Sequence, residues 1–70
     1  MPRLYFVVHV VLKTGVLYVY PRINSESAHK FARGIASGLL LPRLDWESVS
    51  IYCHDGTQSI DEYCYTVATR

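Results

Sequence analysis

The chain has 70 residues, of which 50% are hydrophobic and 19% are charged, and its formal net charge is +1. This composition excludes a disordered chain, a strongly basic nucleic-acid-binding domain and an acidic tail. The length leaves room for one domain, and no apolar run reaches the ~18 to 20 residues of a membrane span, so we expect no membrane partner.

The apolar N-terminal stretch is interrupted by His9 and is not followed by a small-residue cleavage site. We therefore interpret it as a strand rather than a targeting peptide. Two cysteines in a short chain do not form a disulfide framework, which favours a reducing compartment and a cytoplasmic location.

Residues 4–20 are predicted to form a β-hairpin, because apolar residues alternate in a segment rich in β-branched and aromatic side chains. A two-residue turn at Thr14-Gly15 would give Gly15 a positive φ and oppose His9 to Tyr20. Under this register one face carries Val8, Val10, Leu12, Leu17 and Val19. The other face carries Tyr5, Val7, His9, Val11, Tyr18 and Tyr20.

A helix is predicted between an N-cap at Asn24 or Ser25 and a stop at Gly38. Its apolar stripe consists of Ala28, Phe31, Ala32, Ile35 and Leu39. Gly34, inside the helix, would allow close packing on a sheet, and we expect the leucines at 39–41 to form a buried connector.

Residues 46–54 and 60–68 are predicted to form a second strand pair, with the reversal starting at Asp55-Gly56. The connecting loop is too long to fix their register, and a slip of one residue would exchange the two faces. The expected fold is a single α+β domain over residues 1–70, a two-layer ββαββ arrangement in which one helix covers one face of a four-stranded antiparallel sheet. The predicted core is Phe6, Val8, Val10, Leu17, Val19, Phe31, Ile35, Ile51 and Val67.

The uncovered face of this sheet is the candidate working surface. Six tyrosines occur in the chain, and tyrosine suits interfaces because it combines a large apolar area with a polar tip. Tyrosines also favour strands for purely structural reasons. An aromatic sheet could stack single-stranded nucleic acid, but the face has few basic residues, which favours a protein partner. A homodimer formed by pairing the uncovered faces is a third alternative.

Charge is divided along the chain. Residues 1–43 hold six of the seven Lys and Arg residues, whereas residues 44–70 hold five of the six acidic residues. The acidic residues could steer the chain to a basic surface of a partner, or the charges could simply be solvated and paired between the two halves. The predicted partner-binding residues are Tyr5, His9, Tyr18, Tyr20, Tyr52, Asp55, Asp61 and Glu62.

The sequence carries no catalytic signature, and we expect neither an enzyme nor a cofactor. Cys53, His54 and Cys64 are the nearest approach to a metal site, but adjacent residues on a strand point to opposite faces and no CxxC motif is present. We expect no metal and free thiols, with a Cys53–Cys64 disulfide as the alternative.

The segment Ser27-Ala28-His29-Lys30-Phe31-Ala32-Arg33-Gly34-Ile35-Ala36-Ser37, followed by an apolar strand and the Asp55-Gly56 turn, gives the chain a layout that resembles small phage-encoded proteins. These include some anti-CRISPR inhibitors of type I systems. The resemblance implies a compact, non-enzymatic protein that occludes a nucleic-acid-binding surface of a host nucleoprotein complex in the host cytoplasm. Such inhibitors share no sequence signature, so no functional residue is carried over.

Overall fold

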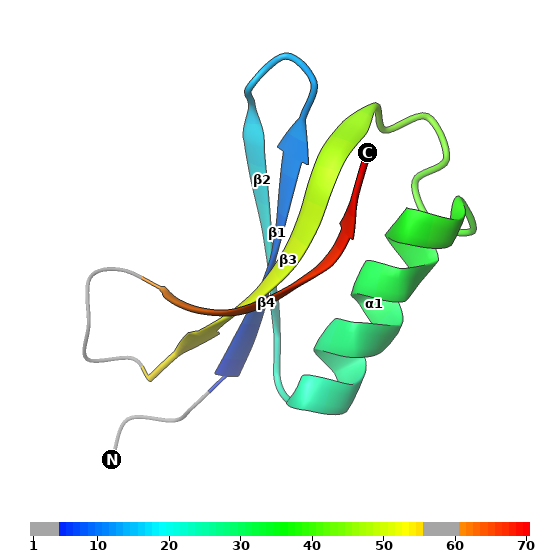
Figure 1. Cartoon of the computed structure of the whole chain (residues 1–70). Coiled ribbons are helices and arrows are strands. Elements are labelled where there is room, and N and C mark those ends of the chain that lie inside the picture. Colours follow the sequence, from blue (N-terminus) through cyan, green and yellow to red (C-terminus); the bar gives the residue numbers. More distant parts are fainter. Residues whose placement is uncertain (1–4, 56–60) are drawn as a thin grey trace.

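The computed structural model describes residues 5–55 and 61–70. Its elements, in chain order, are β1 (Tyr5–Leu12), β2 (Leu17–Arg22), α1 (Ser25–Ser37), β3 (Trp46–His54) and β4 (Glu62–Thr69). The strands form one antiparallel sheet in the order β2-β1-β3-β4, with α1 packed along one face (Figure 1). The predicted α+β fold is confirmed. Leu4, Gly56 and Ile60, which the predicted strands and turn included, lie outside the described residues.

The core lies between α1 and the sheet. Its buried members are Val8, Val10, Ala28, Ala32, Ile35, Trp46, Val49 and Ile51. Three further predicted core residues, Phe6, Phe31 and Val67, are partly buried and pack against this cluster. Leu17 and Val19 are exposed, so their predicted place in the core is wrong.

The register of the first hairpin explains this error. Leu12 N–H donates to the carbonyl of Val16 at 2.8 Å, and Gly15 N–H donates to the carbonyl of Leu12 at 2.9 Å. The loop therefore has three residues, 13–15, and ends at Gly15 with φ of 91°, as expected for a turn closed by a residue in the left-handed region. His9 lies opposite Val19, not Tyr20. A shift of one residue sends every β2 side chain to the other face.

The helix has the predicted ends. The side chain of Asn24 accepts a hydrogen bond from Ser27 N–H at 2.8 Å, and Gly38 closes the C-terminus with φ of 83°. The segment after it differs from the prediction, because residues 39–41 are exposed rather than buried. Gly34 does allow a close approach, but of Leu40 rather than the sheet: a Cβ on Gly34 would lie 2.5 Å from Leu40 Cδ1.

Strand β4 pairs with β3 irregularly. Tyr63 lies opposite Tyr52, and Tyr65 lies opposite Ile51, so Cys64 is an extra residue in β4. A second register shift, between Val49 and Ser50, accompanies it. Within the described part of the chain, no helix is long and apolar enough to cross a membrane.

The core makes a direct prediction for Ile35, which is 1% exposed, against Ile23, which is 76% exposed in the connection before α1. We expect Ile35→Ala to lower the free energy of unfolding by about 2 to 5 kcal/mol, because it leaves a cavity under the helix. Ile23→Ala should change it by less than about 0.5 kcal/mol. Urea denaturation of both variants measures the difference, and equal effects would contradict the placement of α1.

Candidate functional site

The sheet face opposite α1 is called the open face below. Strand alternation and the register place on it Tyr5, Val7, His9, Val11, Leu17, Val19, Pro21, Ser48, Ser50, Tyr52, His54, Tyr63, Thr66 and Thr69. The predicted placement of Tyr5 and His9 on this face is confirmed, and Tyr52, another predicted binding residue, also lies there. The predicted placement of Tyr18 and Tyr20 is wrong, because the three-residue loop turns both side chains to the helix side.

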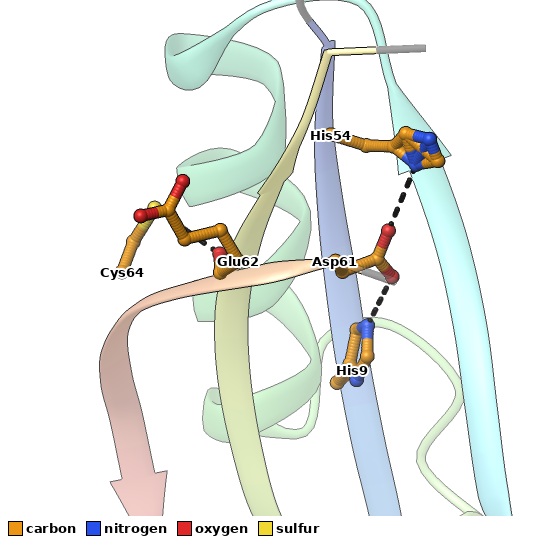
Figure 2. Close-up of polar contacts among 5 residues, drawn as sticks. All are labelled: His9, His54, Asp61, Glu62 and Cys64. Atoms are coloured by element: carbon orange, nitrogen blue, oxygen red, sulfur yellow. Dashed lines mark hydrogen bonds and ion pairs between the residues drawn. The ribbon is translucent and has the colours of Figure 1, made fainter. Parts of the chain in front are cut away.

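A carboxylate joins two histidines on the open face. The Nε2 atom of His9 lies 2.8 Å from Oδ2 of Asp61, and the Nδ1 atom of His54 lies 3.1 Å from Oδ1 of the same residue. Figure 2 shows the two imidazoles on opposite sides of the carboxylate. The side chains come from β1, from the end of β3 and from the residue before β4, so this His9–Asp61–His54 cluster links three parts of the chain.

Aromatic rings support both imidazoles. His9 stacks on Tyr52 with ring centroids 3.8 Å apart, and His54 stacks on Tyr5 at 5.0 Å. Tyr63 meets Tyr52 edge-on at 5.5 Å. Each histidine is thus held by a carboxylate oxygen and by a tyrosine ring, so the cluster is a rigid part of the surface.

Asp61 bridges the two histidines, so their ring nitrogens do not converge on one point. The two nitrogens contact different oxygens of Asp61, whose side chain is only 19% exposed. In residues 5–55 and 61–70, no group of three or more His, Cys, Asp or Glu side chains could hold a metal ion. The cluster satisfies partly buried polar groups and fixes residue 61 on the sheet.

The other part of the open face is aliphatic. On β2, Leu17 is 48% exposed and Val19 is 46% exposed. Tyr63 is a separate exposed residue on β4, at the opposite edge of the sheet, and is 56% exposed. None of these three was among the predicted binding residues. The sequence signal that could have placed Leu17 and Val19 on the open face is Gly15. This glycine fits a three-residue loop as well as a two-residue turn, and the longer loop turns both side chains to the open face.

Three other predicted site residues, Tyr18, Tyr20 and Glu62, do not join this surface. The ring of Tyr20 packs 5.0 Å from that of Phe31, on the helix side, and the ring of Tyr18 lies 6.4 Å from that of Tyr20. The side chain of Glu62 points away from the two histidines (Figure 2) and is exposed. Asp55, which follows β3, is partly exposed.

The two cysteines are free, and the Cys64 thiol donates a hydrogen bond to the carbonyl of Glu62 at 3.9 Å. Burial raises the pKa of the Cys53 thiol, and the charges of Cys64, Glu62 and Asp55 raise it further. Cys64 is exposed.

Comparison with known proteins gives no match: no family model, no curated protein and no solved structure matches the chain. The resemblance to phage-encoded inhibitors therefore stays a prediction.

The cluster predicts a difference between two aspartates. Asp61→Ala removes the common partner of two partly buried imidazoles, so we expect the free energy of unfolding to fall by about 1 to 3 kcal/mol. Asp45, exposed and 3.7 Å from Lys13, is the matched control, and Asp45→Ala should cost less than about 1 kcal/mol. Chemical denaturation compares the variants. A cost for Asp61→Ala no larger than that for Asp45→Ala would mean that the cluster does not support the fold.

The raised pKa of Cys53 predicts slow alkylation. Because only the thiolate reacts, a higher pKa leaves less reactive Cys53 at a given pH below that pKa. In the wild-type chain at pH 8, iodoacetamide should modify Cys64 faster than Cys53, as followed by mass spectrometry of peptides that separate the two cysteines. The reverse order of rates would refute this prediction.

Proposed function

We propose that this chain is a small non-enzymatic protein-binding module and that the open face is its working surface. The observation that supports this most directly is that a sheet face left uncovered by α1 exposes Leu17 and Val19 on one edge strand, β2, and Tyr63 on the other, β4. Exposed apolar patches commonly mark binding sites, and aromatic side chains dominate the energy of typical interfaces.

The chemistry of the face favours an apolar protein segment with little charge as the partner. The strand residues on the open face include neither Lys nor Arg. Arg22 and Arg70 lie on the helix side, where their guanidinium groups sit 3.9 Å from the ring centroid of Phe31 and 4.0 Å from that of Trp46. Nucleic acids are held mainly through phosphate contacts with basic side chains, which this face lacks.

The rigidity of the aromatic part also supports a binding role. Tyr5 and Tyr52 are stacked on imidazoles that Asp61 holds in place, so binding costs little additional side-chain entropy. We assign no steering role to Asp61, because its carboxylate is already bonded to both histidines, or to Glu62, which pairs with Cys53 and lies off the open face.

Two tyrosines of β4 provide a matched test. Tyr63 lies on the open face, whereas Tyr65 lies on the helix side with its ring 5.1 Å from that of His29, and both are exposed. Peptides selected from a displayed random library on the wild-type chain should be rich in apolar residues. Tyr63→Ala should weaken their binding about tenfold or more, and Tyr65→Ala should leave it within about twofold. Fluorescence anisotropy with labelled selected peptides measures both effects.

Two results would overturn the proposal. Equal losses for the two tyrosine variants would place the binding surface elsewhere. Binding of a labelled single-stranded oligothymidine, with affinity that falls steeply as salt rises, would favour a nucleic-acid ligand.

A further inference from the structure

The outer edge of β2 is a second candidate interaction surface. Among the described strands β2 pairs only with β1, so its other edge is free (Figure 1). We propose that a second copy of this chain pairs with this edge, antiparallel and about a two-fold axis, to form a continuous eight-stranded sheet. This inference does not rest on the proposed function, because it uses the backbone of β2 rather than the side chains of the open face.

The hydrogen bonds of the hairpin identify the residues that face outward. Leu12 N–H donates to the carbonyl of Val16, so the backbone groups of Val16 point toward β1. Direction alternates along a strand, so Tyr18 and Tyr20 also bond toward β1, while Leu17 and Val19 direct N–H and C=O groups to the free edge. Pro21 is the next outward residue, and since it has no N–H it costs no bond to β1.

The first four residues of β2, Leu17 to Tyr20, lack the usual protection of an edge strand. They contain no charged residue and no proline, which occur in β2 only at its end, as Pro21 and Arg22. The pairing of β2 with β1 has no register shift. The opposite edge, β4, is interrupted by two register shifts and begins at Glu62. Natural sheets block unwanted edge pairing with such shifts, charges and prolines, so the two edges of this sheet differ in the way expected if only β2 pairs with another strand.

The edge is complementary to itself. Antiparallel pairing of Leu17 in one copy with Val19 in the other, and the reverse, satisfies both outward residues of each chain. The axis then passes beside Tyr18, and the absence of charge in this segment means that no like charges meet across it. Pairing ends at Pro21, whose carbonyl already accepts a hydrogen bond from Arg22 Nη1 at 2.6 Å.

A cross-linking experiment tests this register. In a variant carrying Cys53→Ser and Cys64→Ser, the additional change Tyr18→Cys would place two thiols opposite each other at the axis, at a non-hydrogen-bonded pair with closely spaced Cα atoms. Oxidised glutathione should then convert the two thiols to one interchain disulfide with release of two molecules of glutathione. Leu39→Cys in the same background is the control, because Leu39 is exposed in the segment after α1. We expect the Tyr18→Cys protein to form covalent dimers at least tenfold faster.

Sedimentation equilibrium of the wild-type chain provides the second measurement. We expect a species of twice 8.0 kDa to appear as the protein concentration approaches about 1 mM. Tyr18→Lys, which would bring two like charges together at the axis on the helix side, should reduce its fraction severalfold, whereas Leu39→Lys should not. A mass of one chain throughout that range would overturn the inference. Dimers in which Tyr18→Cys cross-links no faster than Leu39→Cys would also overturn it, and would indicate pairing through the open faces. Failure of the wild-type chain to bind any apolar peptide, together with rapid cross-linking of the Tyr18→Cys protein, would refute the proposed function alone.

Discussion

The loop at residues 13–15 determines what the first hairpin presents to the rest of the molecule. Gly15 adopts a φ of 91° there, a conformation that glycine reaches without steric cost. Because the loop has three residues, Tyr20 packs on the helix side next to Phe31, and Leu17 and Val19 emerge on the open face. A loop shorter by one residue would exchange these positions. The open face therefore owes its aliphatic part to a backbone conformation rather than to the composition of β2.

The other part of the open face depends on a polar contact. His9 and His54 are partly buried on β1 and β3, and their ring nitrogens need partners. Asp61 provides a hydrogen-bond partner for one ring nitrogen of each histidine. It thereby fixes the start of β4, whose pairing with β3 has two register shifts. The face thus joins an aliphatic region, which adapts readily to apolar partners, to an aromatic region whose rings are already held in place.

Local signals in the sequence predicted α1 and the alternation of β1 and β3, because caps and apolar spacing act over a few residues. The face to which each β2 side chain points could not be predicted in this way, since a glycine at position 15 fits loops of two or three residues and these loops give opposite faces. The His9–Asp61–His54 cluster was missed for a related reason. It joins residues 52 positions apart through a hairpin whose register the long loop did not fix, and β4 accommodates extra residues at Val67 and Cys64.

The same register determines which β2 side chains lie on the open face and which β2 backbone groups point to the free edge. When Tyr18 and Tyr20 turn toward the helix side, Leu17 and Val19 become the residues whose side chains lie on the open face and whose backbone groups point to the free edge. In the proposed dimer these two residues meet their counterparts beside the axis, so the two aliphatic regions merge. The aromatic regions around His9 and His54 then lie at either side of one extended apolar strip. A partner of such a dimer would meet a two-fold symmetric surface, which favours a symmetric or elongated apolar segment over a compact charged one.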